Sequence, residues 1–155
     1  MNMSDIAWAT EHSVETTATP AFTWTYITDV KNWDDPPAEF RLNGSFTSGS
    51  LGTTKIPGQA PRQWRLREVK PHDSYTIEIA LEGAVILCKW VFKELPNSQT
   101  RLTQHITLEG ENASSHNCDV QRTFDLTLAP GMSRIAIAID RAYARDPRHY
   151  KHYPL

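Results

Sequence analysis

The chain has 155 residues, 39% of them hydrophobic and 10% aromatic, which is enough apolar material to fill the core of one domain. We therefore expect a single domain over residues 1–155, with its core at about 6–145 and a tail at 146–155. A formal net charge of −2 argues against a nucleic acid partner, because no basic surface is available for a phosphate backbone. The lack of a signal-peptide pattern and of any run of about 18 apolar residues predicts a cytoplasmic protein without a membrane span.

The N-terminal segment 6–19, IAWATEHSVETTAT, alternates between two kinds of side chain. One face carries every second residue from Ile6 to Thr16, including His12, and the other carries Glu11 and Glu15. Such alternation predicts a half-buried strand. His12 is therefore expected on the inner, more apolar face.

Two short helices are expected after this strand. Thr19 can cap a helix over about 20–28, with Pro20 at its first helical position. A second brief helical turn should pass through Trp33. The DDPP motif at 34–37 then ends the helical region, because a residue that precedes proline is pushed out of the helical conformation.

Six further strands are expected between Glu39 and Gly110, separated by Asn-Gly, Pro-Gly, Glu-Gly and similar turns. The segments are EFRLNGSFTSG, GTTKIPG, RQWRLREVKP, SYTIEIALEG, AVILCKWVFKEL and TRLTQHITLEG. In several of them, aromatic and aliphatic side chains alternate with charged ones. The sheet should therefore be antiparallel, with one solvated face and one aromatic face.

The segment RIAIAIDRAY, residues 134–143, alternates like a strand but also fits a helical stripe. The stripe consists of Met132, Ile135, Ala136, Ile139, Ala142 and Tyr143. We interpret it as one long C-terminal helix with Pro130 in its first turn. The fold class is then α+β. A cavity is expected between sheet and helix, because one helix cannot fill the concave side of a curved sheet.

No motif for a nucleotide, a metal or a prosthetic group is found in the sequence. The six histidines lie on different expected elements, and Cys88 and Cys118 lack the CxxC spacing of a zinc or redox site. We therefore expect no metal and no cofactor. Both cysteines should be reduced, with Cys88 in the core.

His12 and Gln104 are polar residues on the apolar faces of their strands, where burial without a partner costs about 1–3 kcal/mol. The sequence leaves three explanations open for these two polar residues. The two side chains bond each other in the core, they contact a ligand, or His12 acts as a general acid or base. His105 lies on the opposite face of its strand from Gln104 and should point to solvent.

Three motifs of the sequence carry a family resemblance. They are ATPAFTWTYITDVKNW, with Trp24, Asp29 and Trp33; NGSFTSGSLGTTK, with Ser50; and TRLTQHITLEG, with Gln104. Together they resemble the SRPBCC (START-like) superfamily, which includes the polyketide cyclase/dehydrase and lipid transport proteins. The first is similar to the segment that this superfamily marks after its first strand, with Trp24, Asp29 and Trp33 at the marked positions. The second is similar to its Gly-x-Phe-x-x-Gly-Thr-x-Gly hairpin, with Ser50 in place of threonine, and the third to a later strand, with Gln104 in place of the common histidine.

The resemblance implies the helix-grip fold, a curved seven-stranded antiparallel sheet wrapped around one long C-terminal helix, with two short helices after the first strand. It also implies that the short helices form a V that supports the start of the long helix. Trp24 would be wedged in the core and Trp33 would lie nearer the pocket entrance. Because an amide cannot titrate, Gln104 is a poor candidate for an acid/base role.

We expect the protein to bind a small hydrophobic or aromatic ligand, lipid-like or polyketide-like, between sheet and helix. The expected lining residues are His12, Trp33, Trp64, Tyr75, Ile77, Trp90, Gln104, Met132, Ile135 and Ile139. One alternative is a cyclase- or dehydratase-type enzyme with His12 as the candidate acid/base, so whether the protein is an enzyme stays open. Another is a protein-interaction module with a filled core, for which a homodimer is one form.

Overall fold

The computed structural model describes residues 6–33 and 37–146. This part of the chain contains seven strands, two α-helices and two short 3-10 helices. In chain order they are β1 (Ile6–Thr16), α1 (Pro20–Ile27), η1 (Val30–Asn32), β2 (Glu39–Leu42), β3 (Leu51–Lys55), β4 (Arg62–Lys70), β5 (Ser74–Leu81), β6 (Ala84–Glu94), η2 (Pro96–Ser98), β7 (Thr100–Glu109) and α2 (Ala113–Arg145). The expected helix-grip architecture is confirmed.

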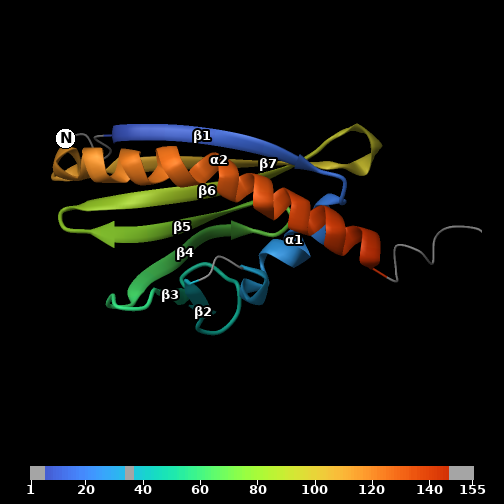
Figure 1. Ribbon diagram of the computed structural model, residues 1–155, viewed down its shortest axis with the longest axis horizontal. Coiled ribbons are helices and arrows are strands. Elements are labelled where there is room, and N and C mark those ends of the chain that lie inside the picture. The colour runs from blue at the N-terminus through green and yellow to red at the C-terminus, as the bar shows by residue number, and fades with distance from the viewer. Residues whose placement is uncertain (1–5, 34–36, 147–155) are drawn as a thin grey trace, which may run out of the picture.

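All seven strands form one antiparallel sheet in the order β1-β7-β6-β5-β4-β3-β2, and α2 lies over the β1 side of it (Figure 1). Two contacts set the direction of α2. Near its first half, Trp8 stacks on Phe124 with ring centroids 6.1 Å apart, and in its second half Asp140 accepts a hydrogen bond of 2.5 Å from Thr16. Eight strand residues and sixteen helix residues both span about 25 Å, so α2 follows β1 along its length.

The break between the two short helices comes from a second cap. Thr19 caps α1 as predicted, because its side-chain oxygen accepts a hydrogen bond of 3.2 Å from a backbone amide in the first turn. Asp29 then caps η1 in the same way at 3.1 Å. The indole Nε1 of Trp33 donates to the Ile27 carbonyl at 2.6 Å, which ties the end of η1 back to α1.

The sequence prediction for the start of the long helix is wrong. α2 begins at Ala113, so Pro130 lies in the interior of a 33-residue helix and not in its first turn. The first half of α2 has a narrow apolar stripe, in which Val120, Phe124 and Leu128 recur every four residues. Proline lacks an amide hydrogen and is rare inside helices. Pro130 was therefore predicted to mark the start of the helix, although the apolar stripe continues on both sides of it.

The expected placement of the two short helices is also corrected. α1 lies beside the second half of α2, where the rings of Phe22 and Tyr143 meet edge to face with centroids 5.0 Å apart. It does not support the start of α2, because that start lies at the opposite end of the sheet, where Asn112 donates to the Gly83 carbonyl at 2.9 Å. Trp24 is 8% exposed and belongs to the core, as predicted.

The side chains between α2 and the sheet form two hydrophobic clusters. The larger one, at the α1 end, includes Trp24, Trp64, Tyr75, Trp90, Phe92, Leu102, Met132 and Ile139. The smaller one, at the other end, includes Ile86, Cys88, Ile106, Leu108, Ala113 and Val120. Gln104 lies between Leu102 and Ile106 on the same face of β7, so the junction of the two clusters contains a polar side chain.

Three other sequence predictions concern the chain as a whole. Residues 34–36 of the DDPP motif and residues 147–155 of the expected tail lie outside the described residues. No helix in residues 6–33 and 37–146 combines the length and the apolar content that a membrane span requires. Both cysteines are free thiols, and Cys88 is buried as predicted whereas Cys118 is exposed.

Candidate ligand-binding site

Four residues form a row across the inner face of the sheet. His12 of β1 lies opposite Gln104 of β7. Gln104 lies opposite Trp90 of β6, which in turn lies opposite Tyr75 of β5. His12 is half-buried and the other three are buried. The sequence pattern predicts all four as site residues, and the strand register brings them side by side.

Aromatic rings fill the inner face toward α1. The ring of Tyr75 meets Phe46 edge to face with centroids 4.9 Å apart and lies nearly parallel to Trp90 at 6.2 Å. Trp24 meets Phe92 at 5.1 Å in the same cluster. Because this packing leaves Tyr75 only 1% exposed, these rings form core and not an open cavity.

Trp33 and Trp64 lie together at the β2–β3 side of the sheet, with ring centroids 5.4 Å apart. Trp64 is 4% exposed, and its Nε1 donates to the Thr54 hydroxyl at 3.1 Å. A side chain at Gly52 would collide with the Trp64 ring, so the glycine provides the space in which the indole packs. These two tryptophans therefore stabilise the far edge of the sheet.

Burial also determines the protonation of two groups in the middle of the inner face. It raises the pKa of the Cys88 thiol from 9.0 to about 12. Burial also raises the pKa of the Tyr75 hydroxyl, with a smaller contribution from nearby Cys88. Both groups are therefore uncharged at neutral pH, and a protonated thiol is a poor nucleophile.

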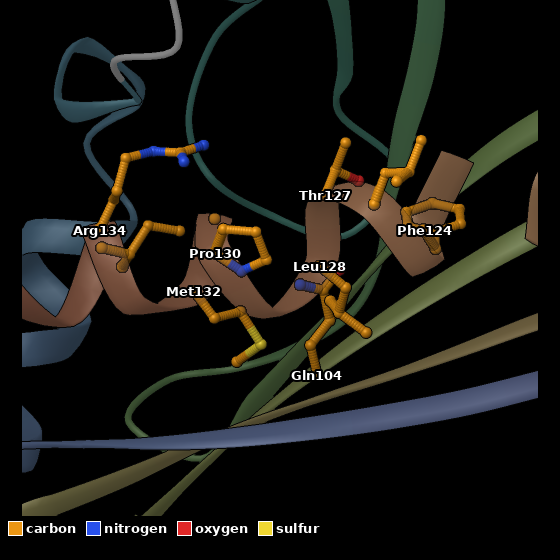
Figure 2. Close-up of a pocket in the computed structure, with 10 residues that line it drawn as sticks. Gln104, Phe124, Thr127, Leu128, Pro130, Met132 and Arg134 are labelled. Carbon is orange, nitrogen blue, oxygen red and sulfur yellow. The ribbon is translucent and has the colours of Figure 1, made fainter. Parts of the chain in front are cut away.

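A pocket of about 320 Å³ lies beside the middle of α2 (Figure 2). Its lining residues are Gln104, Phe124, Leu126, Thr127, Leu128, Pro130, Gly131, Met132, Arg134 and Ile135. In Figure 2, Met132 points from the helix toward the sheet, whereas Thr127 and Arg134 point away from the sheet. The pocket therefore runs from the buried contact between helix and sheet to the exposed flank of α2.

The pocket has one polar side chain at its inner end and two at its outer end. The outer two are Thr127, whose hydroxyl donates to the Thr123 carbonyl at 2.8 Å, and Arg134, which is exposed. The inner one is Gln104, which is 8% exposed. Within the described residues its side-chain amide makes no hydrogen bond, and none joins it to His12 across the strand pair.

Three of the ten predicted site residues line this pocket, namely Gln104, Met132 and Ile135. The other seven do not line it: His12, Trp33, Trp64, Tyr75, Ile77, Trp90 and Ile139. Most of these belong to the larger hydrophobic cluster or pack against it. His12 is next to Gln104 in the sheet, but on the β1 side that α2 covers.

The pocket residues Phe124, Leu126, Thr127 and Leu128 were not predicted from the sequence. They lie on the half of α2 that precedes Pro130. The sequence analysis assigned no helix or strand to this half. The available signal was the four-residue recurrence of Val120, Phe124 and Leu128. Continued through Pro130, that stripe places Phe124 and Leu128 on the same helix face as the next apolar residues.

The described lining residues offer few groups for bond-breaking chemistry. Among residues 6–33 and 37–146, those that line the pocket include no carboxylate, imidazole or thiol, which are the usual general acids, bases and nucleophiles. In the part of the chain that the structure describes, no three His, Cys, Asp or Glu side chains are grouped so that they could hold a metal ion. Apolar walls with one internal amide can hold and orient a small molecule.

Several solved structures are similar to this one. Norcoclaurine synthase from Thalictrum flavum matches with a TM-score of 0.67 at 12% identity, over 94% of this chain and 98% of that one. Protein NE0264 from Nitrosomonas europaea matches with a TM-score of 0.67 at 12% identity, over 88% and 96%. Ms6760 from Mycobacterium smegmatis matches with a TM-score of 0.62 at 16% identity, over 89% and 91%. No family model matches the sequence, and no curated protein matches it significantly.

The chain shares the helix-grip fold with these structures, as the resemblance of its three sequence motifs implied. Another structure of the Thalictrum synthase is a complex with dopamine and hydroxybenzaldehyde. Because all these identities are low, the matches establish the fold alone, and the fold hosts many functions. The function of this chain has to follow from its own pocket.

Proposed function

We propose that this protein binds one small hydrophobic or aromatic molecule in the pocket beside α2. The observation that carries the proposal is a pocket of about 320 Å³ whose exposed wall is somewhat more apolar than polar, with one unpaired amide, Gln104, at its inner end. A ligand would gain affinity from the apolar area that it buries. It would take its orientation from the hydrogen bond to Gln104.

The size of the pocket favours a compact ligand. Small-molecule sites range from about 300 to 1,000 Å³, so this pocket is near the lower limit. A molecule of one or two rings, such as a small polyketide-like compound, fits this space better than a long-chain lipid. Superfamily members typically bind hydrophobic ligands, and the Thalictrum synthase complex holds two small aromatic molecules in the same fold, which supports the proposal.

The proposed unit is the single domain of residues 1–155, acting in the cytoplasm on the sequence grounds given above.

Two other functions have weaker support. As an acid/base residue, His12 would have to come within about 3.2 Å of a substrate proton, directly or through one water, and it does not line the pocket. The aromatic packing around Tyr75 favours a protein with a filled core that acts through its surface. Ligand binding in the pocket distinguishes the main proposal from this second one.

Filling the pocket from Gly131 tests the proposal. Gly131 lines the pocket, and a Cβ added there would meet only Nη2 of Arg134, at 3.8 Å. Leucine at this position can therefore occupy pocket volume without a clash with the backbone. We expect Gly131→Leu to weaken the binding of 2-naphthol, a fluorescent two-ring compound, by about tenfold or more in a fluorescence titration.

Ala129→Leu is the matched control, because Ala129 is exposed on the same helix and does not line the pocket. This variant should bind 2-naphthol as the wild type does. Equal affinities of the two leucine variants would contradict the proposal. So would a wild-type protein that shows no saturable binding of 2-naphthol.

A further inference from the structure

Gln104 interrupts a run of apolar side chains, from Leu102 to Leu108, on the inner face of β7. On either side of it along the strand, Leu102 and Ile106 are both 0% exposed. In the neighbouring strands it lies opposite His12 and Trp90, and it makes a hydrogen bond to neither side chain. Leucine at this position would continue the packing of the strand. Folding therefore gives no reason for the amide.

The amide of Gln104 is unpaired but remains accessible. Among the described residues, the unpaired side-chain atoms that are fully enclosed are Thr23 Oγ1 and Asn117 Oδ1, and no atom of Gln104 is in this group. Gln104 lines the pocket, which gives the amide its access. An accessible amide with no protein partner offers a donor and an acceptor to a bound molecule.

The inner end of the pocket around Gln104 is uncharged. Arg134, the charged lining residue, is exposed at the outer end, and Thr127 already donates its hydroxyl proton to Thr123. A charged ligand group beside Gln104 would lose its hydration without gaining an ion pair, which is strongly unfavourable. A purely hydrocarbon ligand would leave the amide without a partner and cut off from water.

From these contacts we infer that the pocket selects an uncharged aromatic molecule whose ring carries a hydroxyl or carbonyl group, with that group against Gln104. This selectivity rests on the proposed function and deepens it. A phenol hydroxyl can donate to Oε1 of Gln104 or accept from Nε2, and a carbonyl can accept from Nε2. The ring packs against the apolar lining residues beside Gln104, which include Phe124, Leu128 and Met132, because aromatic and thioether groups make favourable contacts with a ring.

Two compounds of the same shape test this inference. 2-Naphthol and 2-methylnaphthalene carry a hydroxyl or a methyl group on the same two rings. Gln104→Met keeps the length of the side chain and removes the amide. The Kd of 2-naphthol should rise about tenfold in this variant, because one buried hydrogen bond is lost. The Kd of 2-methylnaphthalene should not rise, because methionine adds apolar contact.

Gln63→Met is the matched control, because Gln63 is exposed on β4 and does not line the pocket. It should leave both Kd values unchanged. Gln104→Leu is a second apolar variant, and circular dichroism checks that each variant is folded.

The inference would be overturned if the Gln104 variants changed the Kd of 2-naphthol and the Kd of 2-methylnaphthalene by the same factor. The proposed function would then still stand, because both compounds still bind. If neither compound bound saturably to the wild type, the proposed function would be overturned, and the inference with it.

Discussion

The two cysteines differ in their exposure to solvent: the Cys88 thiol is buried and the Cys118 thiol is exposed. Cys88 is 6% exposed at the centre of the sheet, where burial raises its pKa to about 12, and Cys118 is exposed on α2. A group whose pKa is raised by folding keeps its proton after the unfolded chain has lost it. The stability that comes from this difference is complete below the unfolded pKa of 9.0 and is lost as the pH rises through the folded pKa.

We therefore expect the free energy of unfolding to fall from about pH 9 upward, by up to about 1.4 kcal/mol per pH unit for this thiol. Urea denaturation at a series of pH values measures the slope. Cys88→Ala should make the slope shallower, but not flat, because burial also raises the pKa of Tyr75. Cys118→Ala should keep the wild-type slope. The same slope in both alanine variants would show that burial of Cys88 is not its cause.

The face on which each strand residue lies was predictable from the sequence, whereas its hydrogen bonds were not. On β7 the alternation predicts Gln104 inside and His105 outside, and His105 does lie toward solvent, 3.4 Å from the Glu11 carboxylate. The same alternation places His12 opposite Gln104. It does not say whether the two side chains bond each other, because that depends on side-chain rotamers and on the helix packed above them.

Among the elements, α2 is held to the end of β1 by one carboxylate. Asp140 accepts hydrogen bonds from the Thr16 hydroxyl at 2.5 Å, the Thr17 amide at 2.8 Å and the Thr17 hydroxyl at 3.1 Å. Thr16 is 1% exposed, so its hydroxyl has little access to water as a substitute. Since α2 provides most of the pocket wall, these contacts also hold the site in shape.

Asp140→Ala should lower the free energy of unfolding by about 2–3 kcal/mol, because it removes hydrogen bonds to a charged acceptor and leaves the buried Thr16 hydroxyl without that acceptor. Urea denaturation measures the change. Asp125→Ala is the control on the same helix, since Asp125 is exposed, and it should change the value by less than about 0.5 kcal/mol. Similar losses in both variants would show that the docking of α2 does not depend on Asp140.

Elements were predictable where a local signal marks their ends. Thr19 and the Asn-Gly and Glu-Gly turns set such ends, and the helix and strands follow them closely. The start of α2 had no comparable signal, because Asn112 makes no side-chain cap and Pro130 looks like a first-turn residue. A proline inside a helix costs about 3 kcal/mol, which only packing against a distant part of the chain can offset. Such packing cannot be read from the local sequence.

In the molecule as a whole, the pocket lies where the packing of α2 on the sheet changes from one hydrophobic cluster to the other. The sequence predicts an aromatic inner face and a cavity beneath the helix, but not which part of that face remains open. Tyr75 and Trp90 turned out to fill the α1 end together with Phe46, which comes from a distant loop. Phe124 and Leu128 come from the unpredicted half of α2. The position of the pocket thus depends on contacts between residues far apart in the chain.

The most direct test of ligand binding at this position is methyl NMR of Met132 and Ile135 during a titration with 2-naphthol. Ile137 is an internal control, because it is two residues further along α2, 49% exposed and not part of the lining. We expect saturable shifts of the Met132 and Ile135 methyl signals and no saturable shift at Ile137. Unchanged signals of Met132 and Ile135, or a shift of Ile137 as large as theirs, would contradict a ligand site between α2 and the sheet.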